Sequence, residues 1–150
     1  MKTIILYDTK FGNTEKIAKA IGVGMREGGY QEIEVKCGSE TRPDELREAE
    51  IWIFGSPTHM GGTTRNFKKV IRWMKKQGPQ SKRGMAFDTR MEDAKKGAAD
   101  KIAQAMLSVE VEMLCDPPSF TVQDREGPLS QGELERATAI GRKLAAQIRV

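Results

Sequence analysis

The chain has 150 residues, which is enough for one domain with its own hydrophobic core. Hydrophobic residues make up 38% and charged residues 31%, which excludes a disordered chain, and no apolar run approaches the roughly 20 residues that span a bilayer. Two cysteines and one histidine are too few ligands for a zinc or iron–sulfur site. The formal net charge of +4 favours acidic partners or nucleic acid and does not bear on the fold.

The N-terminal residues predict a strand rather than a targeting signal. The apolar run at residues 4–7 is too short for a signal peptide, and no small-residue cleavage site follows it. We therefore expect a cytoplasmic protein that does not bind membranes.

Strand and helix patterns alternate along the chain. Short apolar or alternating runs predict strands at residues 3–7, 31–37, 51–54, 85–87 and 109–113. Apolar residues at helical spacing predict helices over residues 14–27, 43–49, 67–74, 98–106 and 134–148. Strands alternating with helices indicate an α/β fold with a parallel sheet, because parallel strands need crossover connections.

The strand patterns also predict a strand order. Strands one, three and four are unbroken apolar runs, typical of strands covered on both faces, whereas strands two and five alternate with glutamates, typical of partly exposed edges. We predict a single three-layer αβα domain over residues 1–150, with a five-stranded parallel sheet in the order 2-1-3-4-5; another doubly wound order is the alternative. Right-handed crossovers then place the first and fifth helices on one face and the other three on the opposite face. Cys37 and Cys115 fall on opposite edges, which excludes a disulfide between them.

The loop after the first strand, residues 8–14, suits a phosphate. Hydroxyls of Thr9 and Thr14, the Asn13 amide and several backbone N–H groups can converge on one anion at the N-terminus of the following helix. Gly12 allows a close backbone approach. The loop is neither a Walker A motif nor a G-x-G-x-x-G fingerprint, and the alternative is that Asn13 or Thr14 only caps the helix.

Two further loops follow inner strands and meet the first at the carboxyl edge of the predicted sheet. Residues 55–63 form a glycine-punctuated loop with hydroxyls and one imidazole, which suits a planar polar ring; the alternative is an ordinary loop with His59 at the surface. Residues 88–92 could border the same ligand, and the alternative is a solvated loop with an Asp88–Arg90 pair. One ligand could contact all three loops.

These motifs resemble those of flavodoxins. Residues 7–16, YDTKFGNTEK, resemble the FMN phosphate loop of flavodoxins and of the flavodoxin domain of flavo-diiron proteins, and residues 54–62, FGSPTHMGG, resemble the second FMN loop. Residues 87–90, FDTR, and 125–129, REGPL, resemble segments of small archaeal and bacterial flavodoxin-like proteins. The resemblance extends over essentially the whole chain and is to the short-chain type.

The resemblance implies a flavodoxin-like fold that binds FMN and cycles it between semiquinone and hydroquinone. It assigns the phosphate to Thr9, Gly12, Asn13 and Thr14, and the sides of the isoalloxazine ring to residues 56–62 and 88–91. Gly61 or Gly62 would supply the peptide that turns its carbonyl toward the flavin. The residues expected to contact FMN are Thr9, Lys10, Phe11, Gly12, Asn13, Thr14, Ser56, Pro57, Thr58, His59, Met60, Gly61, Gly62, Asp88, Thr89 and Arg90.

The chain departs from the family pattern in three ways. Phe11 replaces a hydroxyl residue of the phosphate loop, a loss that the charge of Lys10 could offset. The usual stacking aromatic of the third loop is absent, so stacking would fall to Met60, His59 or Arg90. The protein is basic, whereas flavodoxins are generally acidic.

The basic residues cluster on the third helix. Between residues 65 and 83 the chain has eight basic residues and no acidic one. One interpretation is a solvated helix face without a specific function. The other is a docking surface for an acidic redox partner. Nucleic acid is not favoured, because no stacking platform of aromatic residues accompanies the charges. The residues of this docking surface are Arg65, Lys68, Lys69, Arg72, Lys75 and Lys76.

Three functions remain open. The first is a one-electron carrier with non-covalent FMN. The second is an NAD(P)H-dependent FMN or quinone reductase of the same fold, and the third is a binding module that has lost the flavin. No nucleophilic triad or metal centre can be assembled from the sequence, so the chemistry would belong to the cofactor.

Overall fold

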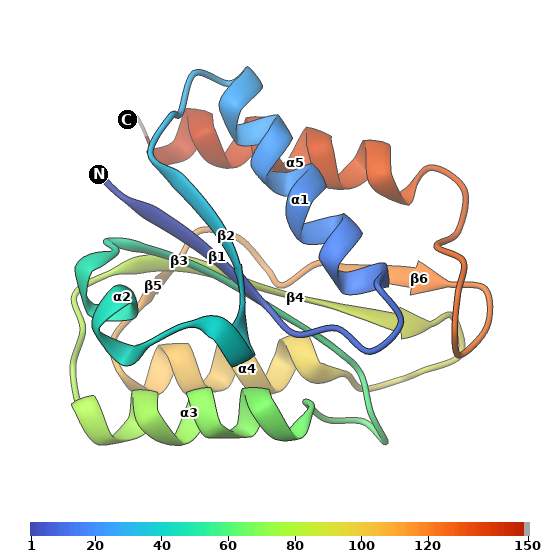
Figure 1. Cartoon of the computed structure of the whole chain (residues 1–150), viewed down its shortest axis with the longest axis horizontal. Coiled ribbons are helices and arrows are strands. Elements are labelled where there is room, and N and C mark those ends of the chain that lie inside the picture. Colours follow the sequence, from blue (N-terminus) through green and yellow to red (C-terminus); the bar gives the residue numbers. More distant parts are fainter. Residues whose placement is uncertain (149–150) are drawn as a thin grey trace.

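The structure, a computed structural model, describes residues 1–148 (Figure 1). The strands are β1 (Thr3–Tyr7), β2 (Ile33–Cys37), β3 (Ile51–Pro57), β4 (Arg83–Met91), β5 (Glu112–Met113) and β6 (Ser119–Val122). The helices are α1 (Asn13–Glu27), α2 (Pro43–Glu48), α3 (Arg65–Gln77), α4 (Ala98–Ser108) and α5 (Glu133–Ile148), with a 3-10 turn η1 (Gly38–Glu40).

The predicted strand order is confirmed. The main path of the sheet is β2-β1-β3-β4-β5, and every pairing along it is parallel. All residues of β1 are buried and all residues of β2 are only half-buried, as expected for an inner strand and an edge strand. The order reverses between β1 and β3, and this reversal opens a crevice at the carboxyl ends of the two strands.

Helices cover both faces of the sheet, distributed as predicted (Figure 1). α1 and α5 lie together on one face, over Ile5, Ile53 and Phe87. α2, α3 and α4 cover the opposite face, which carries the alternate residues Ile4 and Leu6 of β1. Successive side chains of a strand point to opposite faces, so each inner strand supplies both cores.

The fifth strand differs from the prediction. The alternating pattern of residues 109–113 predicts one strand, but Val109 ends α4, and Glu110 turns the chain with a φ of 62°. Only Glu112–Met113 pairs with the beginning of β4. Val109 and Val111 are buried, and Met113 is partly buried, because they pack against the same core as α4.

The strand β6 was not predicted. It pairs with the second half of β4, over Asp88–Met91. β5 and β6 therefore pair in turn with the first and second halves of β4. Pro117 and Pro118 separate the two strands, and neither has an N–H to donate to a ladder. β4 consequently runs to Met91, so the expectation of a loop over residues 88–92 is wrong for Asp88–Met91.

Two other expectations concern the cysteines and the membrane. Cys37, at the end of β2, and Cys115, beyond β5, are both free thiols, as predicted. Of the helices in residues 1–148, none is long and apolar enough to cross a membrane. The cytoplasmic location stays a prediction.

Candidate cofactor site

A cavity of about 400 Å³ lies at the carboxyl ends of β1, β3 and β4, where the sequence placed a ligand. Four segments far apart in the chain form it: the turn between β1 and α1, the loop after β3, the end of β4, and the end of β6 with the loop that follows it. Its lining residues are Thr9, Lys10, Phe11, Asn13, Thr14, Pro57, Thr58, His59, Met60, Thr89, Arg90, Met91, Val122 and Arg125.

The turn between β1 and α1 leaves a helix N-terminus open. Gly12 is the N-cap of α1, with a φ of 91°, and no side chain caps the helix. The alternative that Asn13 or Thr14 caps it is therefore not what the structure shows. The first N–H groups of an α-helix lack intrahelical partners and carry partial positive charge. A Cβ built on Gly12 would meet nothing within 4 Å, so an anion has room beside these N–H groups.

Side-chain hydrogen bonds hold the turn in this shape. The Thr9 hydroxyl accepts from the N–H of Gly12 at 2.9 Å, and the Asp8 carboxylate accepts from the N–H of Thr9 at 2.9 Å. Both hydrogen bonds connect residues within the turn. The backbone N–H groups of the helix start are thus positioned before any ligand arrives.

Asn13 and Thr14 connect the turn to the rest of the site. The Asn13 side-chain amide donates to the carbonyl oxygen of Glu126 at 3.1 Å, and the Thr14 hydroxyl lies 2.8 Å from that of Thr89. Both side chains are buried. They fix the helix start against β4 and against the loop after β6.

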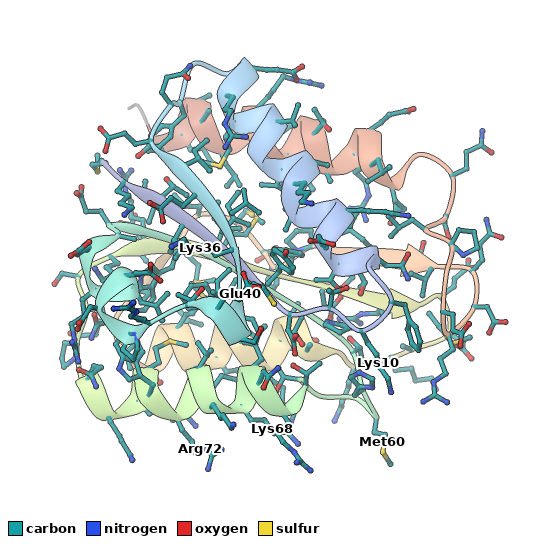
Figure 2. All side chains as sticks on the ribbon, in the orientation of Figure 1. Lys10, Lys36, Glu40, Met60, Lys68 and Arg72 are labelled. Carbon is teal, nitrogen blue, oxygen red and sulfur yellow. The ribbon has the colours of Figure 1, made fainter. Side chains whose placement is uncertain are left out.

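The loop after β3 contains a tight turn. His59 and Gly62 exchange two backbone hydrogen bonds of 2.8 Å each, which leaves Met60 at the tip with a φ of 49°. Figure 2 shows the Met60 side chain projecting away from the protein at this tip, and it is fully exposed. Gly61 and Gly62 do not line the cavity; they line a larger groove on the other side of the turn.

Asp88 and Arg90 form the base of the site on β4. The Arg90 guanidinium donates to both carboxylate oxygens of Asp88, at 3.1 and 2.7 Å. This hydrogen bonding raises the pKa of the Arg90 guanidinium. Asp88 is completely buried and also accepts from the Thr58 hydroxyl at 3.2 Å and from the N–H of Ala99 at 2.9 Å. The solvated loop pair considered from the sequence is instead a buried junction of three elements.

The structure brings most of the predicted site residues together. Gly12, Ser56, Gly61, Gly62 and Asp88 are the predicted residues that do not line the cavity. The buried Ser56 hydroxyl donates to the carbonyl oxygen of Pro57 and accepts from the N–H of Thr64, so it supports the loop from behind.

Sequence reasoning missed two lining residues, Val122 and Arg125, as ligand contacts, whereas Met91 lies in the segment 88–91 that was expected beside the ring. Val122 could not be found because β6 itself was not predicted. The resemblance of residues 125–129 to flavodoxin-like segments was the one signal for Arg125.

Positive charge surrounds the cavity. Lys10, Arg90 and Arg125 line it, and the pKa of His59 is lowered from its usual 6.5 by burial and then by repulsion from Lys10 and Arg125. The Lys10 ammonium also lies 5.6 Å from the centre of the exposed Phe11 ring. A phosphate would be attracted here, and protonation of the His59 imidazole is disfavoured.

The lining fits a ligand with an anionic end and a flat ring. The uncapped helix start and the cations suit a phosphate, while Phe11, Met91 and Val122 provide apolar surface. The volume falls within the range of about 300–1,000 Å³ that is usual for cofactor sites. These residues therefore fit a flavin mononucleotide.

Comparison with known proteins agrees with this fit. The family model for Flavodoxin matches residues 5–99. The chain belongs to the flavodoxin family. Members of this family bind FMN and transfer electrons to redox partners.

Individual relatives of this flavodoxin-family protein support the same assignment. A flavodoxin of Clostridium saccharobutylicum is 38% identical over 91 residues, which cover 59% of this chain and 56% of that protein. An NAD(P)H dehydrogenase (quinone) of Archaeoglobus fulgidus is 32% identical over 95 residues, covering 47% of this chain and 49% of the relative. The chain thus spans about half the length of these relatives. A solved flavodoxin structure from the domain Archaea superposes with a TM-score of 0.84 at 25% identity, over 100% of both chains.

Proposed function

We propose that this protein is an electron carrier that binds one FMN non-covalently at the carboxyl ends of β1, β3 and β4 and passes single electrons to a protein partner. The observation that carries the proposal is the uncapped start of α1 at Gly12, which opens beside a cavity of cofactor size. Bound FMN supplies the chemistry by alternating between its one-electron and two-electron reduced forms.

The protein's own residues bind and orient the cofactor in this proposal. The N–H groups of Asn13, Thr14 and Glu15 bind the phosphate, and the Thr9 hydroxyl holds the turn in the binding shape by accepting from the N–H of Gly12. His59 and Met60 border the ring from the loop after β3, and Thr89 and Arg90 border it from β4. The role of Gly61 or Gly62 as a turning peptide stays a prediction.

The partner in this proposal is acidic. The basic residues predicted as a docking surface lie on α3, and those of them that line the groove beside the cavity place positive charge next to the loop that holds His59 and Met60. Opposite charge on a partner would steer its approach to this side of the flavin.

A second candidate is a reductase that takes electrons from NAD(P)H. The similarity to the quinone-type NAD(P)H dehydrogenase of Archaeoglobus fulgidus is the observation that favours it. Steady-state oxidation of NADH or NADPH by the FMN-loaded protein with a quinone acceptor distinguishes the two. Steady-state turnover supports the reductase. If the protein shows no turnover but still exchanges electrons with a redox protein, the result supports the electron carrier.

Titration of FMN fluorescence tests the flavin site. We expect saturable quenching at micromolar or tighter affinity, and at least about tenfold weaker binding of riboflavin, which lacks the phosphate. Equal affinity for the two ligands would contradict the role of the α1 N-terminus. A lack of saturable quenching would support the third alternative, a module that has lost the flavin.

Two matched glycine variants sharpen this test. Gly12 and Gly132 both have positive φ and open space around a Cβ. The neighbours of Gly12, Phe11 and Asn13, line the cavity, whereas no neighbour of Gly132 does. Gly12→Ala and Gly132→Ala should each cost about 1 kcal/mol of folding stability from left-handed backbone strain. Only Gly12→Ala should weaken FMN binding, by about tenfold, because its methyl group enters the space beside the phosphate-binding N–H groups. Equal FMN affinity of the two variants would refute the assignment.

A further inference from the structure

A groove of about 1500 Å³ adjoins the cofactor cavity on the face covered by α3 and α4. The two helices lie side by side there (Figure 1), and the turn after β3 also lines the groove. Thr9, Lys10, His59 and Met60 line both the groove and the cavity. Whatever lies in the groove is therefore next to the proposed flavin edge.

The groove is strongly and uniformly basic. Asp8 is its one acidic lining residue and is itself buried. Its seven basic lining residues come from the turn after β1, from α3, and from α4 with the segment before it. They are Lys10, Arg65, Lys68, Arg72, Lys75, Lys96 and Lys101. In the part of the chain that the structure describes, none of the seven forms an ion pair.

The structure divides the basic residues of α3 into two sets. Arg65, Lys68, Arg72 and Lys75 recur at helical spacing and line the groove. Figure 2 shows Lys68 and Arg72 pointing outward from the same side of α3. Lys69 lines a separate hollow beside Trp73, and Lys76 lines neither. Of the six residues predicted from the sequence as a docking surface, four therefore line the groove, and Lys69 and Lys76 do not.

The dimensions of the groove favour a macromolecular occupant. Small-molecule sites of about 300–1,000 Å³ enclose most of their ligand, whereas this groove is larger and open along its length. α3 has 13 residues and is about 20 Å long, which matches a short peptide segment. Ile71 and Ala105 give the groove apolar patches between the charges.

The chemistry of the lining selects among macromolecules. No phenylalanine, tyrosine or tryptophan lines the groove, so it lacks the stacking platform on which single-stranded nucleic acid binds. Unpaired cations on two helices instead match carboxylates arranged along a peptide.

We infer that the groove between α3 and α4 binds an acidic segment of a partner protein and so places that partner beside His59 and Met60. That the partner carries a redox centre rests on the proposed function; binding of the acidic segment does not. The groove includes Lys96 and Lys101, which no sequence pattern associated with α3.

Fluorescence anisotropy with a labelled oligoglutamate peptide as long as α3 tests this inference. We expect binding at low ionic strength that weakens steeply with added salt. FMN-free and FMN-loaded protein should bind the peptide alike, so failure of the flavin site and failure of the groove give different results. Tighter binding of oligothymidylate of the same length, or displacement of the peptide by equimolar NADPH, would overturn the choice of an acidic peptide.

Matched pairs of variants locate the binding. Lys68→Gln/Lys75→Gln and Lys69→Gln/Lys76→Gln remove the same charge from exposed positions of the same helix. The first pair should weaken peptide binding about tenfold and the second less than about twofold, because Lys69 and Lys76 do not line the groove. Lys96→Gln and Lys95→Gln provide the same comparison beside α4, with the loss expected only for Lys96→Gln. Equal losses within either comparison would show attraction to net charge and would overturn the inference.

Discussion

The hydroxyl oxygens of Thr14 and Thr89 lie 2.8 Å apart, with both side chains buried, and join the first turn of α1 to β4. The bond links the two sides of the cofactor cavity, because both residues also line it. The geometry of the proposed phosphate site and that of the strand opposite are therefore coupled.

Replacing Thr89 with valine tests this coupling. The variant keeps the size of the side chain but leaves the buried Thr14 hydroxyl without its partner, which should lower the free energy of unfolding by about 1–2 kcal/mol. Urea denaturation of the FMN-free protein measures the change. Thr121→Val on β6, whose side chain is partly exposed, is the control and should change stability by less than about 0.5 kcal/mol. Similar losses in both variants would show that the hydroxyl pair contributes nothing specific.

Asp88→Asn should be strongly destabilising. The buried Asp88 carboxylate accepts from Arg90, from Thr58 and from the N–H of Ala99, so it joins β4, the loop after β3 and α4. Removing one partner of a buried ion pair costs about 3–5 kcal/mol, and we expect the lower end of this range because Arg90 keeps a second carboxylate, that of Asp100, at 3.7 Å.

Glu27→Gln is the matched control for this variant. Glu27 pairs with Arg142 at 2.7 Å, but both side chains are about half exposed, so the loss should be below about 1 kcal/mol. Chemical denaturation of both variants measures the difference. A loss for Asp88→Asn no larger than that for Glu27→Gln would contradict the structural role of Asp88.

His59 should titrate below its usual range. Burial, followed by the charges of Lys10 and Arg125, lowers its pKa from 6.5. The chain has one histidine, so its ring protons are unambiguous in a proton NMR titration. Lys10→Gln should raise this pKa by removing repulsion, whereas Lys143→Gln on α5 should leave it unchanged. No difference between the two variants would contradict the proximity of Lys10.

The direction of the pH dependence of stability follows from the same shift. The unfolded chain protonates His59 more readily than the folded one, so protonation of His59 favours unfolding. The contribution of neutral His59 to the free energy of unfolding is therefore complete above pH 6.5, and it is lost as the pH falls through the lower folded-state pKa. His59→Gln should therefore remove part of the decline in stability below pH 6.5. An unchanged decline would show that His59 is not protected from protonation in the folded state.

The charges around the cavity should raise the second one-electron reduction potential of bound FMN. A cation near the ring stabilises the anion that the second electron creates. Lys10→Gln should lower this potential by on the order of 30 mV, and the distant Lys143→Gln should change it far less. Spectroscopic redox titration measures both. A wild-type potential as low as that of strongly acidic flavodoxins would contradict the effect.

Local patterning predicted most of the architecture. Unbroken apolar runs at 3–7 and 51–54 distinguish inner strands from the alternating run at 31–37, and the burial of each strand follows from that difference. The turn at Gly12 could be recognised because its chemistry depends on adjacent residues. These features were accessible because each depends on residues close together in the sequence.

Contacts between distant segments decided the rest. Asp88 and Arg90 carry polar side chains after a short apolar run, so the sequence predicts a loop, and only pairing with β6 and contact with α4 make the segment a buried strand. The basic residues of α3 look like one surface in the sequence, but the position of α4 divides them, because a groove exists only where two helices meet. Local sequence encodes the conformation and polarity of each segment, while the packing of segments against one another sets which side chains are buried, paired or brought together.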